Sequence, residues 1–408
     1  MNKVVKNTTW NFIGFFIYLF SQWLMSILVV RLSGNYEEAG VFGIAMSTCN
    51  IFYVISTFSV RNYQVADIGD RFSNGEYVTF RLITCGISLL ILPIYLIIMK
   101  YSMYIFWSVM CFMLLKTGEA LIDVFQGIFQ KVWRLDIVCR SYIIRGILNL
   151  AVFSLVEWAL KNMVFALLAA AIVSLICGAL FDFLPCRTMC DIKVEIRPKR
   201  FSKFLICVLP VFIHGFLSVL IYNTPRIVAQ KLCGEEQFGY YSSVAAPTVI
   251  IQLAVNCVFS PIISLMAEQY TKRDKKLTRT ILMVQVIIII VGICAIVGFT
   301  LLGNWFLKIA FGEEILEYSG LLVPAVVAAF FIADTAFIAS ILVVLDMNII
   351  MAGLEAISFV AVLILSFVLI GEFGLQGINY ALILSCVIFI IMGYCAVIRN
   401  ISTSFKNI

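Results

Sequence analysis

The chain has 408 residues and a mean hydropathy of +1.05, and 62% of its residues are hydrophobic while only 13% are charged. Soluble globular domains carry charge on roughly a quarter of their residues, so this composition excludes a soluble protein and indicates one that crosses a membrane many times. The net charge of +6 comes from scattered basic residues, with no basic run interleaved with aromatic residues. Nucleic acid is therefore not expected as a partner.

A membrane-spanning helix needs about 20 predominantly apolar residues. The sequence contains twelve stretches of this kind, approximately at 8–30, 41–60, 79–99, 103–127, 142–160, 163–184, 204–229, 241–265, 280–302, 320–345, 352–371 and 376–398. The pattern predicts an all-α integral membrane protein with about 12 transmembrane helices, six in each half of the chain.

A short sequence recurs between the first two stretches of each half. Residues 31–40 read RLSGNYEEAG and residues 231–239 read KLCGEEQFG. An offset of about 200 residues between similar segments is the sign of an internal repeat, here two parallel halves related by an axis along the membrane normal. We expect a first lobe at 1–184, a cytoplasmic linker at 185–203 and a second lobe at 204–408. Two such lobes around a central cavity are the plan of a transporter.

Basic residues are distributed unevenly over the loops. If the amino terminus is cytoplasmic, most of the 29 Lys and Arg residues fall in cytoplasmic segments, and those outside are only Arg31, Lys100, Lys161, Lys231 and Lys308. Because cytoplasmic loops carry an excess of Lys and Arg, both termini are predicted to be cytoplasmic.

The loops leave little room for catalytic chemistry. They are short, none carries a phosphate-binding G-x-x-x-x-G-K-[ST] loop, and His214 is the only histidine. The 13 cysteines are scattered without a C-x-x-C pair. We therefore expect neither an enzyme nor a bound cofactor or metal.

The fourth predicted span carries a polar stripe. Lys116, Glu119, Asp123, Gln126 and Gln130 are spaced by three and four residues, which places all five on one face of a helix. Ionisable groups within a membrane usually face a bundle interior or a wet cavity, so the stripe predicts a hydrophilic wall. The alternative is a self-neutralising set of Lys116, Glu119 and Asp123 that joins helices. Arg145, in the next span, either completes this cluster or reaches out to the headgroups.

The first span of each half carries a second stripe. His214, Ser218, Tyr222 and Arg226 recur every four residues in span seven, and the corresponding positions in span one include Gln22. Arg226 is a candidate contact for an anion, since a guanidinium binds phosphate as a fork; the alternative is an arginine that reaches the interface. His214 is either a proton relay or a packed, hydrogen-bonded residue.

Three further polar groups stand out. Asp334 lies near the middle of span ten and is a candidate site for a proton or a coupling ion, or a partner for Arg226. Glu355 is expected at the interface. Asn11 lies within the first span and can contact sugar hydroxyls or a neighbouring helix.

Several segments of the chain are similar to a known transporter family. These are 7–11 (NTTWN), 31–33 (RLS) with 38–43 (EAGVFG), 60–67 (VRNYQVAD) and 238–241 (FGYY). Together with the arrangement of six plus six spans, they resemble the multidrug/oligosaccharidyl-lipid/polysaccharide exporter superfamily. Within that superfamily the chain looks like the Wzx-type flippases of capsule and O-antigen repeat units.

The resemblance implies the transport of an undecaprenyl-pyrophosphate-linked oligosaccharide from the inner to the outer leaflet of the bacterial cytoplasmic membrane. Under this reading Lys116, Arg145, Arg226, Asn11, Gln22 and Tyr222 would bind the substrate. The groups that balance charge or bind a coupling ion, H⁺ or Na⁺, would be Glu119, Asp123, Asp334 and His214. A polysaccharide polymerase and a chain-length regulator are candidate protein partners, besides membrane lipid.

Two other functions fit the same composition. A multidrug exporter driven by Na⁺ or H⁺ would have the same fold but a cavity dominated by carboxylates and aromatic residues. A polysaccharide polymerase would use similar substrates. The cations Lys116, Arg145 and Arg226 argue against the drug exporter, and the short outer connections near 31–40, 231–240 and 303–319 argue against the polymerase.

Overall fold

The computed structural model describes residues 3–67, 71–190, 192–194, 198–259, 262–274 and 276–405, and most of them are helical. It divides into two compact units, Met1–Phe216 and Leu217–Ile408. Within the described part, twelve helices are long and apolar enough to cross a membrane, as the sequence predicts. The boundary between the units falls inside one helix, beyond the linker expected at 185–203.

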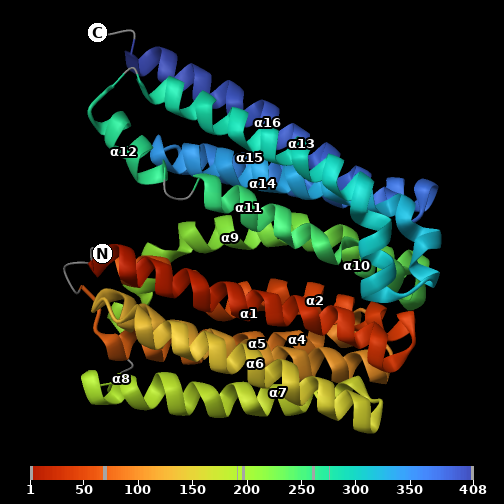
Figure 1. The fold of residues 1–408 in the computed structure, drawn as a ribbon. Coiled ribbons are helices and arrows are strands. Elements are labelled where there is room, and N and C mark those ends of the chain that lie inside the picture. The colour runs from red at the N-terminus through yellow and green to blue at the C-terminus, as the bar shows by residue number, and fades with distance from the viewer. Residues whose placement is uncertain are drawn as a thin grey trace. The chain divides into compact units, whose positions relative to one another are not determined.

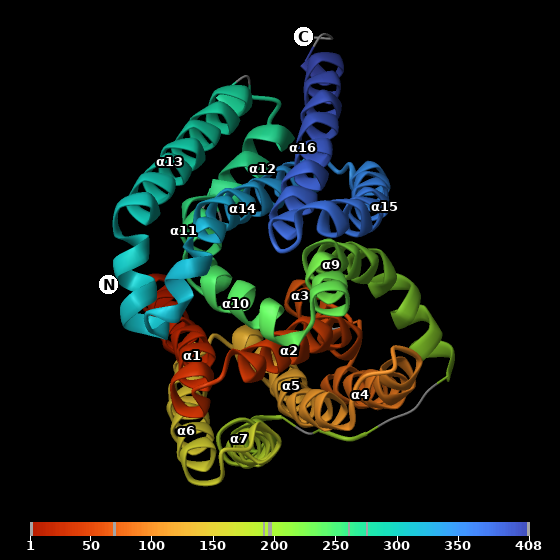
Figure 2. The same ribbon diagram turned by 90° about the vertical axis from the view of Figure 1, so that its right-hand side faces the viewer.

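The first unit contains the first six spans (Figure 1). Its elements are α1 (Lys3–Ser33), α2 (Tyr36–Thr57), α3 (Val60–Ala66), α4 (Asn74–Ile98), α5 (Met103–Lys131), α6 (Leu135–Leu160), α7 (Met163–Gly178), the π-helix η1 (Ala179–Phe183), α8 (Leu184–Met189) and the first part of α9 (Pro198–Cys233). In this unit α5 packs against α2, α4 and α7, while α1 packs along α6 (Figure 2). The polar face of α5 is therefore enclosed by other helices.

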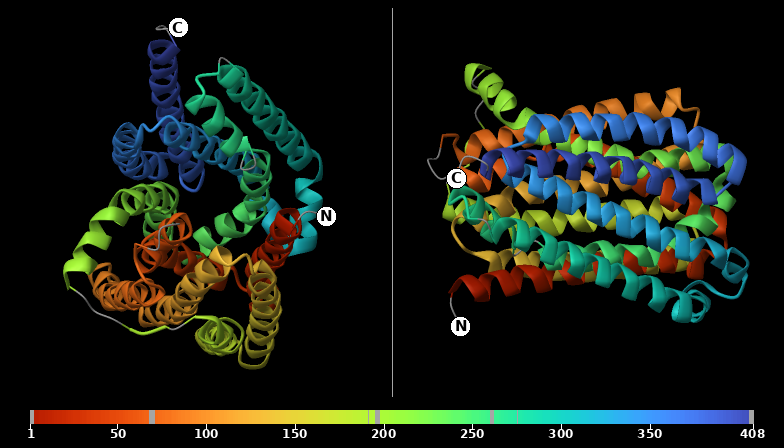
Figure 3. Two further views of the ribbon diagram at one scale, coloured as in Figure 1. Left: turned by 90° about the vertical axis from the view of Figure 1, so that its left-hand side faces the viewer. Right: turned by 90° about the horizontal axis from the view of Figure 1, so that it is seen from above.

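The second unit contains the rest of α9 and the last five spans. Its further elements are α10 (Glu235–Ala245), η2 (Ala246–Thr248), α11 (Val249–Phe259), α12 (Ile263–Thr271), α13 (Lys276–Phe311), η4 (Glu314–Leu321), α14 (Leu322–Val344), α15 (Asn348–Phe373) and α16 (Gln376–Phe405). Here α14 packs against α11, α13 and α16, and α15 lies beside α16 (Figure 3).

The repeated sequence forms the same turn in both units. Gly34 ends α1 with φ +69°, and Gly234 follows α9 with φ +87°, a region that glycine enters without steric cost. Each glycine N–H donates to the carbonyl four residues earlier, Val30 at 2.9 Å and Gln230 at 3.0 Å. The shared turn supports the internal repeat.

Several helices begin at a residue that caps them. The Asn35 side chain accepts a hydrogen bond from the Glu37 N–H before α2, and Ser73 forms a reciprocal capping box with Glu76 at the start of α4. Such caps satisfy backbone N–H groups that have no partner within the helix. Outward-facing side chains such as Leu90 and Leu301 are 71% and 75% exposed, as expected of helices that face lipid.

Candidate functional site

The polar stripe of the fourth span lies on α5, which is helical from end to end of the predicted segment. Lys116, Glu119 and Gln126 are buried, and Asp123 and Gln130 are partly buried. Burying charged groups is costly unless they are paired, so their partners decide what the stripe can do. Those partners form two groups of residues.

The first group surrounds Glu119. Lys116 Nζ lies 3.0 Å from Glu119 Oε2, and the Tyr18 hydroxyl donates to Glu119 Oε1 at 2.5 Å. Gln22 Nε2 donates to the same Oε1 at 2.9 Å and to the Tyr18 hydroxyl at 2.7 Å. We call Tyr18, Gln22, Lys116 and Glu119 the Glu119 cluster. It joins two candidate residues of α5 to Gln22 of α1, a contact that the sequence analysis does not predict.

Close approach of α1 to α6 brings Tyr18 into this position. A Cβ atom at Gly14 would lie 2.7 Å from Cys139 Cα, and one at Gly146 would lie 3.2 Å from Tyr18 Cα. Glycine at both positions lets the two backbones pack tightly, the use that membrane helices commonly make of small residues.

Arg145 of α6 is buried beside the Glu119 cluster. Its guanidinium carbon lies 4.6 Å from the centre of the Tyr18 ring and 5.4 Å from that of Tyr142. Only 2% of the residue is exposed, so the alternative of an arginine that reaches the headgroups is wrong. Its Nε and Nη1 atoms have no hydrogen-bond partner among the described residues. Arg145 is thus a buried cation held by aromatic faces.

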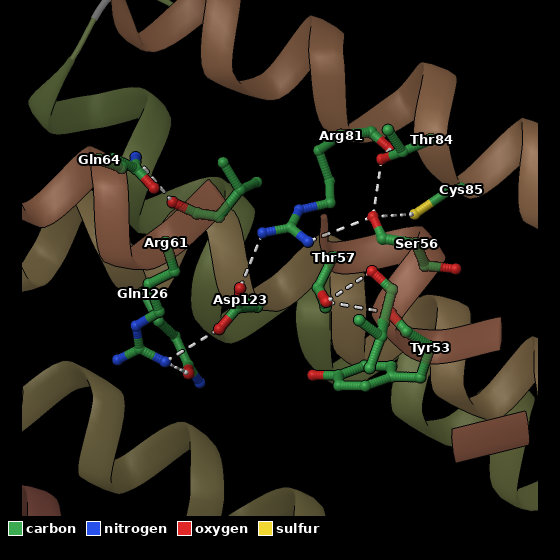
Figure 4. Close-up of polar contacts among 12 residues, drawn as sticks. Tyr53, Ser56, Thr57, Arg61, Gln64, Arg81, Thr84, Cys85, Asp123 and Gln126 are labelled. Carbon is green, nitrogen blue, oxygen red and sulfur yellow. Dashed lines mark hydrogen bonds and ion pairs between the residues drawn. The ribbon is translucent and has the colours of Figure 1, made fainter. Parts of the chain in front are cut away.

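The second group surrounds Asp123 (Figure 4). Arg61 Nη1 lies 3.0 Å from Asp123 Oδ1, and Arg81 Nη2 lies 2.8 Å from Oδ2. Arg61 also donates to Gln126 Oε1 at 3.2 Å and to Gln130 Oε1 at 3.1 Å. We call Arg61, Arg81, Asp123, Gln126 and Gln130 the Asp123 cluster. The self-neutralising set of three residues is therefore wrong in part, because Asp123 pairs with two arginines of other helices and not with Lys116.

Arg81 is held by backbone as well as by charge. Its Nη1 donates to the Ser56 carbonyl at 3.2 Å, and the Thr84 hydroxyl donates to the same carbonyl at 2.7 Å. Ser56 lies at the end of α2, where Phe58 and Ser59 adopt positive φ angles and the chain turns into α3. This turn presents the Ser56 carbonyl to Arg81 and Thr84, and it leads into the helix that carries Arg61.

Asp182 is a third buried carboxylate of the first unit. It lies in the π-helix η1, where the Leu184 N–H bonds to the Ala179 carbonyl five residues earlier. Its Oδ2 accepts a hydrogen bond from the Ser141 hydroxyl at 2.5 Å, whereas Oδ1 has no hydrogen-bond partner among the described residues. Asn11 of α1 also has a buried side-chain oxygen without such a partner, and it joins neither cluster.

In the second unit, Arg226 and Tyr222 form a pair. The Arg226 guanidinium carbon lies 4.2 Å from the centre of the Tyr222 ring, and Nη2 donates to the Tyr222 hydroxyl. Arg226 is buried, so the alternative of an arginine that reaches the interface is wrong. His214 lies in the part of α9 that belongs to the first unit, so the boundary between units divides this stripe.

Asp334 and Glu355 each accept a hydrogen bond from a neutral side chain. Gln285 Nε2 donates to Asp334 Oδ1 at 2.9 Å, and the Tyr394 hydroxyl donates to Gln285 Oε1 at 2.5 Å. The alternative that Arg226 pairs with Asp334 is not borne out. Glu355 accepts a hydrogen bond from Ser218 at 2.8 Å and is buried, so its expected interfacial position is wrong.

Sequence reasoning missed Arg61, Arg81, Tyr18 and Asp182 as members of the site. The rule that cytoplasmic loops carry an excess of Lys and Arg assigns Arg61 and Arg81 to loops. One pattern marks Arg81, which together with Thr84, Cys85 and Ser88 gives α4 a polar face at helical spacing.

The chain is similar to proteins of surface polysaccharide synthesis and of transport. No protein-family model matches it. Over 397 residues it is 24% identical to the capsular polysaccharide biosynthesis protein CapF of Staphylococcus aureus, an alignment that covers 96% of this chain and 98% of CapF.

Two solved structures illustrate the fold. One is the lipid II flippase MurJ in an inward closed conformation, with a TM-score of 0.72, 13% identity and coverage of 99% of this chain and 90% of MurJ. The other is an outward-facing multidrug resistance transporter of the MATE family, with a TM-score of 0.65, 14% identity and coverage of 98% and 96%. The resemblance predicted from the sequence is confirmed: the chain is a multi-pass membrane protein with the fold of the transporters of the MOP superfamily, and over nearly its whole length it is similar to a protein of capsular polysaccharide synthesis.

Proposed function

We propose that this protein moves undecaprenyl-pyrophosphate-linked oligosaccharide repeat units from the inner to the outer leaflet of the bacterial cytoplasmic membrane, for capsule or O-antigen synthesis. The similarity to CapF supports a role in a polysaccharide pathway. The fold shared with MurJ supports the movement of a lipid-linked precursor in place of a covalent reaction.

The observation that carries the proposal is the gathering of basic side chains in the interior of the first unit, among which Arg145 keeps N–H donors without a hydrogen-bond partner among the described residues. The two clusters, Arg145 and Asp182 together contain four basic and three acidic side chains, listed as Arg61, Arg81, Lys116, Arg145, Glu119, Asp123 and Asp182. Lys116, Arg61 and Arg81 are already paired with carboxylates. Arg145 keeps N–H donors without a partner among the described residues, and a planar guanidinium is well suited to a diphosphate.

The other candidate residues take roles that fit their contacts. Lys116 and Arg226 would attract the diphosphate or acidic sugars, and Asn11, Gln22 and Tyr222 offer amide and hydroxyl groups to sugar hydroxyls. Glu119, Asp123, Asp334 and His214 would balance charge or bind a coupling H⁺ or Na⁺. Stacked Tyr222 and Arg226 support a binding role, since the pair presents a fixed cation beside an aromatic face.

Transport would proceed by alternating access, with the polyprenyl tail remaining in lipid. A membrane potential that is negative inside favours the outward movement of an anion by about 2.3 kcal/mol per charge per 100 mV. The excess of basic residues in alternate loops supports a chain with both termini in the cytoplasm. A polysaccharide polymerase and a chain-length regulator would act on the delivered repeat unit.

The experiment that tests the proposal measures lipid-linked oligosaccharides in a deletion strain. We expect single completed repeats to accumulate on the inner leaflet and surface polymer to be lost. Single repeats that reach the outer leaflet without polymerising would instead assign the protein to polymerisation. Unchanged lipid-linked sugars and unchanged polymer would leave a cation-coupled multidrug exporter as the better reading.

A further inference from the structure

Two buried groups of opposite charge in the first unit lack the hydrogen-bond partners that their neighbours have. Arg145 has two nitrogen atoms, Nε and Nη1, without a hydrogen-bond partner among the described residues, and Asp182 has one such oxygen, Oδ1. Both residues are almost fully enclosed, with exposures of 2% and 0%. A buried charge without close partners is costly, so the position of both groups needs a reason.

Ser141 places these two groups next to each other. It donates to Asp182 Oδ2 at 2.5 Å, and it lies four residues before Arg145 on α6. Residues four apart on a helix are neighbours on one face, so the Asp182 carboxylate lies one turn along α6 from the Arg145 side chain. Asp182 Oδ1 and the Arg145 Nε and Nη1 atoms do not bond to each other, because none of the three has a hydrogen-bond partner among the described residues.

The π-helix determines where Asp182 lies on its span. The five residues Ala179–Phe183 interrupt the α-helical register of α7, and Asp182 is the buried residue among them. Such a turn is a local departure from the ordinary hydrogen-bond pattern and occurs frequently at functional sites. On the other side, Gly146 lets Tyr18 pack against Arg145. The guanidinium is therefore held by rings, with a carboxylate nearby that it does not contact.

We propose that Asp182 is a positioning residue that competes with an anionic diphosphate group for Arg145, and so lowers the affinity of this cation for its cargo. The inference rests on the proposed function, because it gives Arg145 a diphosphate ligand. A bound anion would accept hydrogen bonds from Nε and Nη1, and the Asp182 carboxylate would oppose it by like-charge repulsion across a short distance.

Such a residue favours release of the cargo. A transporter that binds its ligand too tightly cannot release it on the other side of the membrane. A nearby carboxylate lowers the affinity for the ligand without changing the shape of the site. Asp182 is well suited to this role, since Ser141 fixes one of its oxygens and the other has no hydrogen-bond partner among the described residues.

The test measures the binding of inorganic pyrophosphate to the purified full-length chain in detergent by titration calorimetry. Asp182→Asn should tighten binding by about tenfold, within the range of couplings between interacting sites. Asp182→Glu, which keeps the charge, should bind as the wild type does. Arg145→Gln should weaken binding strongly, and adding Asp182→Asn to Arg145→Gln should produce no further change.

Two variants serve as controls. Ser141→Ala removes the hydrogen bond to Asp182 but keeps its charge, and should alter affinity by less than about twofold. Glu157→Gln removes a buried carboxylate that lies on α6 itself, twelve residues or about 18 Å along the helix from Arg145. It should not change the affinity for pyrophosphate. Should Asp182→Asn fail to fold, Asp182→Ser removes the same charge with a smaller side chain.

Equal affinities in the wild type and in Asp182→Asn would overturn the inference, as would tightening that persists in the Arg145→Gln background. Absence of pyrophosphate binding in both proteins would also overturn it. None of these results bears on the leaflet experiment in the deletion strain, so failure of the inference and failure of the proposed function are distinguishable.

Discussion

Arg81 Nη2 lies 2.8 Å from Asp123 Oδ2, and no part of the Arg81 side chain is exposed. The pair joins α4 to α5, with the arginine fully buried and the carboxylate partly buried. The other Asp123 oxygen is held by Arg61, whose side chain is 21% exposed. One carboxylate thus neutralises a fully buried arginine and a more accessible one.

Asp123→Asn should destabilise the protein substantially. It leaves Arg81 buried without its counter-ion, and breaking a buried pair on one side costs about 3–5 kcal/mol. Thermal unfolding in detergent should show a clear loss of stability for Asp123→Asn and a smaller loss of stability for Arg61→Gln. A double variant with Arg81→Gln should regain part of the loss, and an Asp123→Asn protein as stable as the wild type would contradict the pairing.

Lys116→Ala and Arg226→Ala should each reduce surface polysaccharide several-fold in cells that contain normal amounts of inserted protein. Each removes a cation that we assign to the diphosphate or to acidic sugars. The measurement is polymer at the cell surface against protein in the membrane. Lys272→Ala is the matched control, because Lys272 is exposed and pairs with Glu268 within one helix. If both test variants make as much surface polysaccharide as the wild type, these two cations do not bind the substrate.

Gly14→Ala should lower thermal stability, because the new Cβ would lie 2.7 Å from Cys139 Cα and 2.9 Å from its carbonyl oxygen. The backbones of α1 and α6 would have to separate. Gly86→Ala is the control: it lies within α4 with no atom within 4 Å of the new Cβ, and should be neutral or stabilising by about 0.5–1 kcal/mol. Similar melting temperatures for the two variants would refute the close packing.

The stability contributed by Asp67 should depend on pH. Burial alone would raise the pKa of this carboxyl, but hydrogen bonds from the Tyr77 hydroxyl and from the backbone N–H groups of Arg71 and Phe72 lower it below the ordinary 3.8. The folded state therefore binds the proton less tightly than the unfolded state. The contribution is complete above pH 3.8 and is lost as the pH falls through the lowered pKa.

We expect Asp67→Asn to be less stable than the wild type by about 1–2 kcal/mol at pH 7, with a gap that narrows below about pH 4. Unfolding in detergent between pH 7 and pH 3 measures this. Tyr77→Phe keeps the carboxylate but removes one of the hydrogen bonds that lower its pKa, so its pH dependence should be weaker than that of the wild type and stronger than that of Asp67→Asn. A stability difference between the wild type and Asp67→Asn that stays constant between pH 7 and pH 3 would contradict this prediction.

The helices and part of the site follow from the sequence alone. Spans are visible because each requires a long apolar run, and the stripe on α5 is visible because Lys116, Glu119 and Asp123 share one helix. Their partners are not visible in the same way. Arg61 and Arg81 reach Asp123 from 62 and 42 residues away, and only packing determines that they meet.

Asp182 illustrates a second limit. It lies near the end of an apolar span, where a carboxylate is usually read as interfacial, and a π-turn rather than an α-turn directs it inward. Glu355 misleads in the same way, since distance along a span does not reveal whether a side chain faces the bundle or the headgroups. Position along a helix can be counted from a sequence, whereas the direction of a side chain depends on its neighbours.

The paired glycine turns record how the chain arose. Duplication of an ancestral half copies backbone and side chains together, but a turn with positive φ resists later substitution because few residues other than glycine adopt it readily. Gly34 and Gly234 keep that inherited geometry. The charged residues of the two halves differ. The fourth span of the first half, α5, carries Lys116, Glu119 and Asp123, whereas the fourth span of the second half, α14, carries Asp334. The two units therefore share the geometry of the turn but differ in the charged side chains that they enclose.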